Sequence, residues 1–170
     1  MLKRNPSKFI CFGSILIALT VIFQSAPVFL PAIGMALSPF STLPIAISAA
    51  INIPLGFIVF LSSVLIIAVI SVEEALILLF TTGVLGFMIG ILLFRKGLII
   101  SVLLSSIALT LGMLGLTYLI GVTAFVDFTR QISTPFILVA YFLFSVVYGC
   151  IWNIGIRNFM NYLIKIKLIK

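Results

Sequence analysis

One long stretch without charge decides what class of protein this chain can be. No Asp, Glu, Lys or Arg occurs between Ala26 and Ser71. A membrane crossing takes about 20 apolar residues, so this stretch has room for two crossings. Across all 170 residues, 64% are hydrophobic and only 8% are charged, which is too few charges to coat a water-soluble surface. We therefore expect an all-α integral membrane protein.

Further apolar runs raise the expected number of membrane-spanning helices to six. The first run follows a basic segment, in the order typical of a signal sequence, but Pro27 directly after Ala26 makes a poor cleavage site. We therefore expect this helix to be retained. The expected spans of the six-helix transmembrane bundle are 9–25, 28–48, 52–71, 75–94, 97–121 and 135–156, followed by a basic cytoplasmic tail over 157–170.

Prolines interrupt the second and third expected helices and leave the position of their turn open. One interpretation places the turn at Ser38–Thr42, which leaves a short second span and a long third helix that Pro54 kinks. The other places it at Asn52-Ile53-Pro54. Both fit, because proline lacks an N–H and disfavours helix in the residue before it. Interrupted helices at membrane depth are a mild indication of a binding site.

The charged residues predict the orientation of the six spans. Nine basic residues fall on one side of the bundle: Lys3, Arg4, Lys8, Arg95, Lys96, Arg157, Lys165, Lys167 and Lys170. The acidic residues Glu73, Glu74 and Asp127 fall on the other side, together with Arg130. The positive-inside rule then predicts a multi-pass protein of the cell membrane with both termini cytoplasmic. Orientation and attraction to anionic lipid explain the three basic clusters, so we expect no nucleic-acid partner.

Missing residue types exclude several chemistries. The chain contains no histidine, which removes a required member of the common zinc sites, of Ser-His-Asp triads and of haem ligation by His. Nothing resembles a phosphate-binding or dinucleotide-binding loop. We expect no enzyme activity, no cofactor and no metal. Cys11 and Cys150 lie in apolar runs near opposite ends of the chain and are expected to be small buried side chains.

Small residues at helical spacing predict close helix packing. Gly83, Gly86 and Gly90 occur along the fourth span, and Gly86-x-x-x-Gly90 has the spacing that allows two helix backbones to approach closely. Ser14-x-x-x-Ala18 repeats this spacing in weaker form in the first span. These residues serve either packing inside the bundle or docking to another subunit.

The adjacent acidic residues Glu73 and Glu74 have two readings. Some intramembrane proteases carry an EExxxR motif, but Leu78 stands at the arginine position here and no histidine can complete such a site. The simpler expectation is that both carboxylates help to start the following helix through its dipole. A role facing a substrate or attracting a cation remains the alternative.

A small-molecule pocket, if there is one, is expected to open outward. Tyr141, Ser145, Tyr148 and Trp152 share one face of the last span. Such aromatic rings either fill a bundle core or line a ligand pocket. Directional polar groups on the outer half complete the candidate substrate-binding set, which is Gln24, Tyr118, Asp127, Arg130, Tyr141 and Tyr148. Asn153, further inward, needs a hydrogen-bond partner and should face protein.

The layout resembles the six-helix substrate-binding S components of energy-coupling factor (ECF) transporters and the related YybS-like membrane proteins. The likeness is strongest over Leu37–Gly97, where Leu37-Ser38-Pro39 and Leu43-Pro44 lead into the sequence TGVLGFMIG at 82–90 and then into Phe94-Arg95-Lys96-Gly97. The resemblance implies a substrate captured from outside and a cytoplasmic ATP-driven module as partner. It also implies docking through small residues of the first helix, where Ser14 and Ala18 replace the family's two alanines.

Two functions from different classes follow. The first is a substrate-binding subunit of a small-molecule uptake transporter. The second is a non-transporting scaffold or regulator that binds another membrane protein. Transport predicts polar groups around a solvated pocket on the outer half, whereas a scaffold predicts a filled bundle with an exposed face of small residues.

Overall fold

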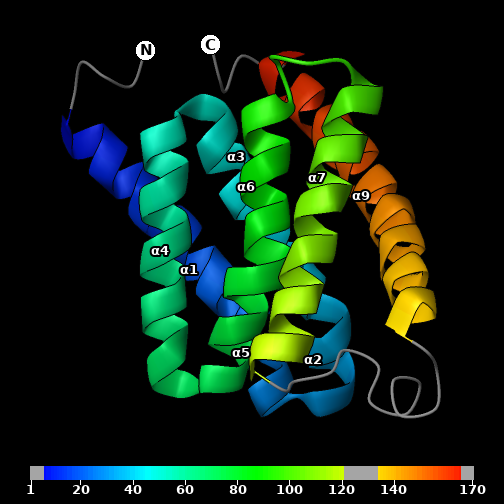
Figure 1. The fold of residues 1–170 in the computed structure, drawn as a ribbon. Helices are drawn as coiled ribbons and strands as arrows, with labels where there is room; N and C mark the ends of the chain where they lie inside the picture. Colours follow the sequence, from blue (N-terminus) through cyan, green and yellow to red (C-terminus); the bar gives the residue numbers. More distant parts are fainter. Residues whose placement is uncertain (1–5, 121–133, 166–170) are drawn as a thin grey trace.

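The computed structural model describes residues 6–120 and 134–165, and these are almost entirely helical (Figure 1). Six helical stretches within them are long and apolar enough to cross a membrane: Phe9–Phe29, Pro31–Ile51, Ile53–Ile70, Val72–Leu92, Leu98–Tyr118 and Phe136–Tyr162. This confirms the predicted all-α bundle of six helices. The protein is therefore a multi-pass helical bundle that would lie in a lipid bilayer.

The elements follow one another in an up-and-down order. They are α1 (Pro6–Phe29), α2 (Pro31–Leu37), the 3-10 turn η2 (Ser38–Ser41), α3 (Thr42–Ile51), α4 (Ile53–Ile70), α5 (Val72–Ile77), the π-helical turn η3 (Leu78–Thr82), α6 (Gly83–Leu92), α7 (Leu98–Gly115), the π-helical turn η4 (Leu116–Ile120) and α9 (Thr134–Lys165). We call the end where α3 meets α4 and α6 meets α7 the Arg95 end. The opposite end, where α4 meets α5, is the Glu74 end (Figure 1).

The open question about the second turn is answered at Asn52. This residue is extended (φ −155°, ψ 124°) and separates α3 from α4. Pro54 lies in the first turn of α4, where a missing N–H costs nothing. The other candidate turn, Ser38–Thr42, instead forms η2 and the start of α3, so that α2, η2 and α3 make one span with a tightened middle.

Two helices extend beyond the expected boundaries. Helix α1 continues through Pro27 to Phe29. Helix α9 continues to Lys165, so that much of the expected basic tail is helix.

Helix α3 is the centre of the fold. Thr42 and all residues from Pro44 to Ala49 are buried, and α3 packs against α1, α4 and α6. Helices α7 and α9 form a second unit, joined to the first mainly through contacts of α7 with α6. This arrangement leaves α1 and α9 at the periphery, with many apolar side chains exposed toward lipid.

Close packing between α3 and α6 depends on glycine. A Cβ atom at Gly86 would lie 2.6 Å from the Thr42 carbonyl oxygen, and one at Gly90 would lie 2.5 Å from that of Ala46. Gly83 faces the Phe60 ring and the Leu78 carbonyl instead. All three predicted packing glycines therefore lie against protein, and none of them is left for docking to another subunit.

The cysteines correct one expectation. Cys11 is exposed on α1 and Cys150 is half-buried on α9. An apolar run predicts burial only in water, because in a bilayer the outer face of a helix is apolar as well.

Candidate functional site

Four polar side chains from three spans meet in the half of the bundle nearer the Glu74 end. Gln24 of α1 is fully buried, and its amide nitrogen donates to Oε2 of Glu74 at 2.8 Å. Its amide oxygen accepts hydrogen bonds from the hydroxyls of Ser41 at 2.8 Å and Thr82 at 3.1 Å. We call Gln24, Ser41, Glu74 and Thr82 the Gln24 cluster.

The start of α5 positions Glu74. Ser71 is the N-cap residue, and its hydroxyl accepts a bond from the Glu74 backbone N–H at 3.4 Å. Glu73 and Glu74 then occupy the first turn, where carboxylates are favoured by the helix dipole. The two differ in environment, since Glu73 is exposed whereas Glu74 is half-buried. Glu74 can therefore both stabilise the start of α5 through the helix dipole and face a ligand.

Irregular helical turns position the two hydroxyls. Ser41 closes the 3-10 turn η2, and Thr82 closes the π-helical turn η3. A π-helical turn accommodates an extra residue and so changes the direction in which the following side chains point. Single π turns are frequent at functional sites. The interruption at Pro39 therefore contributes to the cluster, because the 3-10 turn that contains this proline ends at Ser41.

The free hydrogen-bonding capacity of the Gln24 cluster is mainly that of an acceptor. Two hydroxyl groups already occupy both lone-pair directions of the Gln24 amide oxygen. A carboxylate offers about four acceptor positions, and Gln24 uses one of those on Glu74. The cluster is thus suited to groups that donate hydrogen bonds or carry positive charge, and they would approach along the half-buried Glu74 side chain.

The structure distributes the other predicted substrate residues over separate places. Tyr141 is buried, with its hydroxyl 3.1 Å from that of Thr117. Tyr118 is exposed. Tyr148 stacks on Phe144 with ring centroids 5.6 Å apart. Of the six predicted substrate residues, Gln24 is a member of the Gln24 cluster. Asp127 and Arg130 lie outside the residues that the structure describes.

The aromatic face of α9 connects to the first two spans. The Trp152 ring lies 6.2 Å from Tyr148 and meets Phe40 of η2 edge-on at 5.7 Å. Phe40 in turn lies 6.2 Å from Phe23 of α1. Trp152 therefore sits at the depth of η2 and helps to join α9 to the rest of the bundle.

Asn153 forms a second buried polar group, between α7 and α9. It is fully buried, accepts a bond from the Ser101 hydroxyl at 2.5 Å and donates to Ser105 at 3.1 Å and to the Gly149 carbonyl at 2.8 Å. The prediction that Asn153 faces protein is confirmed. Its bonds are all made inside the α7–α9 pair.

The small residues of α1 face outward. Ser14 and Ala18 are exposed. The Ser14 hydroxyl donates a hydrogen bond to the carbonyl of Ile10 in the same helix at 2.9 Å, so its proton needs no acceptor on another helix. Cys11 is exposed close to them, one helical turn before Ser14. This face of α1 is therefore available to another membrane helix.

Sequence reasoning identifies Gln24 and offers a ligand-facing role for Glu74 as an alternative, but it misses Ser41 and Thr82. In the sequence, Ser41 is part of a possible turn and Thr82 is part of a glycine-rich segment. The available signal is the distribution of polar residues, since Gln24 and Glu74 lie toward the same end of their spans and Ser41 and Thr82 lie near the middle of theirs. Helix rotation, which decides whether they meet, depends on η2 and η3 and leaves no periodic trace in the sequence.

Comparisons of the chain with protein-family models, with curated proteins and with solved structures find no match. The function has to be inferred from the chain's own residues.

Proposed function

We propose that this protein is the membrane-embedded substrate-binding subunit of a small-molecule uptake transporter, as its resemblance to ECF S components implies. The observation that carries the proposal is the Gln24 cluster, in which a buried amide joins a carboxylate and two hydroxyls from three spans. Polar groups inside a membrane are costly and commonly mark substrate or ion pathways. Interrupted helices likewise surround the binding sites of many transporters.

The charge distribution orients the proposed site. Lys8, Arg95 and Lys96 belong to the Arg95 end, whereas Glu73 and Glu74 lie at the other end. By the positive-inside rule, the Arg95 end and both termini are cytoplasmic in the cell membrane. The Gln24 cluster then lies in the outer half, where an uptake system first meets its substrate.

Reporter fusions test this orientation. A reporter active only in the cytoplasm should be active when fused after Lys96, and a reporter active only outside should be active when fused after Glu74. The physical reason is that moving Arg95 and Lys96 outward would place two adjacent positive charges on the disfavoured side. An outside signal after Lys96 would contradict the proposed orientation.

Because no nucleotide-binding motif is present, the energy for uptake would come from a partner protein or from an ion gradient. An ATP-driven module on the cytoplasmic side is the partner that the resemblance implies. The exposed Ser14 and Ala18 on α1 supply a face of small residues that a partner helix could approach closely.

Adjacent carboxylates provide a matched test of substrate binding. Small molecules released from purified wild-type protein should be identified and quantified by mass spectrometry. Glu74→Gln should reduce the amount or affinity of the bound molecule by about tenfold or more, because a charge-assisted hydrogen bond is lost. Glu73→Gln, which changes an exposed carboxylate, should leave binding within about twofold of the wild type by the same reasoning.

Two results would contradict the proposal. One is equal retention of the molecule by both variants. The other is the absence of any bound small molecule in protein whose thermal unfolding shows that it is intact.

The scaffold or regulator is the second candidate function. It is favoured by the internal hydrogen bonds of the Gln24 cluster, which hold three spans together without a ligand, and by the exposed face of α1. This function predicts that neither glutamate variant changes a bound molecule, because none is present.

A further inference from the structure

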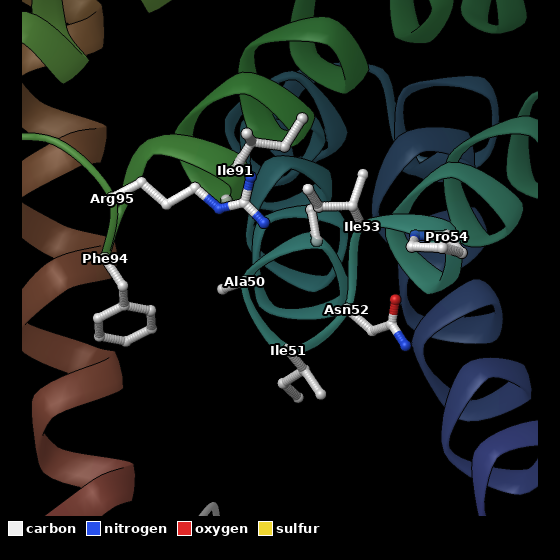
Figure 2. Close-up of a pocket in the computed structure, with 10 residues that line it drawn as sticks. Ala50, Ile51, Asn52, Ile53, Pro54, Ile91, Phe94 and Arg95 are labelled. Carbon is white, nitrogen blue, oxygen red and sulfur yellow. The ribbon is translucent and has the colours of Figure 1, made fainter. Parts of the chain in front are cut away.

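A pocket of about 260 Å³ lies at the Arg95 end, on the opposite side of the membrane from the Gln24 cluster. Its walls are the last turn of α3, the turn at Asn52, the beginning of α4 and the last part of α6 (Figure 2). Gly90 contributes to the wall without a side chain. None of the residues that line this pocket belongs to the Gln24 cluster.

The end of α3 supplies hydrogen-bond acceptors to the pocket. The last four carbonyls of a helix lack partners within the helix. In α3, Asn52 N–H bonds to the carbonyl of Ser48, which leaves those of Ala49, Ala50 and Ile51 without an intrahelical partner. Pro54 has no N–H to offer them. All three residues line the pocket.

Arg95 supplies hydrogen-bond donors. Figure 2 shows its side chain reaching across the end of α3, with the guanidinium group near Ile91 and Ile53, while the Asn52 amide points away. Arg157, by comparison, donates to the Lys96 carbonyl at 3.4 Å. Arg95 makes no such bond with the described residues. A guanidinium group has five N–H donors and binds phosphate in a forked geometry.

The two sets of groups fit a ligand that carries both charges. An anion would pair with Arg95, and an ammonium group would donate to the carbonyls at the end of α3, where the helix dipole also favours a cation. The volume is below the range of about 300–1,000 Å³ that is typical of pockets for drug-sized ligands, so a small polar group fits better than a whole organic substrate.

The position of the pocket points to lipid as the source of that group. Three spans begin or end around it, at Ile51, Ile53 and Leu92, which places it at the depth of the headgroups. Phe94, which lines the pocket, has 57% of its surface exposed and offers an apolar contact to an acyl chain. We propose that this pocket binds the headgroup of a phospholipid with a primary ammonium group, its phosphate on Arg95 and its ammonium on the end of α3.

Lipid titrations of the purified full-length protein, followed by native mass spectrometry, test this inference. The probes are phosphatidylethanolamine and phosphatidylcholine with the same acyl chains, since a trimethylated ammonium cannot donate a hydrogen bond. The wild type should bind phosphatidylethanolamine about fivefold or more tightly, and Arg95→Gln should weaken that binding about tenfold. Lys96→Gln, which removes the neighbouring exposed charge, should retain the preference.

Three outcomes would overturn the proposal. Equal binding of the two lipids would exclude the ammonium contact, and equal behaviour of the Arg95 and Lys96 variants would exclude the guanidinium contact. Competition by soluble glycerophosphoethanolamine at the same concentration as the lipid would identify a soluble phosphate ester as the occupant instead. Since Arg95 is exposed, its variant should unfold at the temperature of the wild type. The inference does not depend on the proposed transport function.

Discussion

Replacing Gly90 by alanine should lower the apparent unfolding temperature of the detergent-solubilised protein by about 2–10 °C, as expected for a cost of 1–3 kcal/mol. The new methyl group would lie 2.5 Å from the carbonyl oxygen of Ala46 and 2.6 Å from Cβ of Ala49. Both alanines are buried in α3, the centre of the bundle, so the clash can be relieved only by moving α6 away from α3. Thermal unfolding followed by circular dichroism measures the change.

Gly155 provides the matched control for this prediction. It lies in α9, and a Cβ atom there would meet nothing within 4 Å. Gly155→Ala should leave the unfolding temperature unchanged or raise it, because alanine favours helix over glycine by up to about 1 kcal/mol. If both substitutions had the same effect, the α3–α6 crossing could not be as close as described.

Most of the architecture was predictable because it follows from hydrophobic length and charge. Six spans, the small-residue spacing of Gly86 and Gly90, and the need of Asn153 for a partner all come from the cost of exposing polar groups to lipid. The turn at Asn52 was one of two possibilities. The sequence could not decide between them, because Pro39 and Pro54 satisfy the same local rule and only tertiary packing shows which interruption bends the chain back.

The composition of the candidate site was less predictable. Tyr141 and Gln24 both belong to the half of their spans nearer the Glu74 end, yet Tyr141 pairs with Thr117 whereas Gln24 pairs with Glu74. The depth of a residue in the membrane follows from its position along its span. The sequence does not show which helices lie next to one another. The turns η2 and η3 add a further rotation, which brings Ser41 and Thr82 onto Gln24 without any change in hydrophobic pattern.

A small number of polar contacts connects α9 to α7. Lipid is as apolar as leucine, so burial of apolar side chains gives little net force between helices, and packing and hydrogen bonds decide which faces meet. Gly149 allows α9 to approach Ser106 of α7, since a Cβ atom there would lie 2.8 Å from the Ser106 hydroxyl oxygen. One helical turn further along, Asn153 reaches Ser101 and Ser105.

Asn153→Ala should therefore destabilise the protein, and the effect should depend on Ser101. The substitution removes three hydrogen bonds and leaves a small gap between α7 and α9, for which we expect a loss of about 1–3 kcal/mol. In a double-mutant cycle with Ser101→Ala, the coupling energy should be about 0.6 kcal/mol and no more than about 1.7 kcal/mol, the mean and the maximum for hydrogen bonds between membrane helices. Asn158→Ala, on an exposed position of the same helix, should change stability by less than about 0.5 kcal/mol. Reversible unfolding in mixed micelles gives the free energies of unfolding of the wild type and of the four variants. A coupling energy of zero would mean that the hydrogen bond from Ser101 to Asn153 contributes nothing to the pairing of α7 with α9.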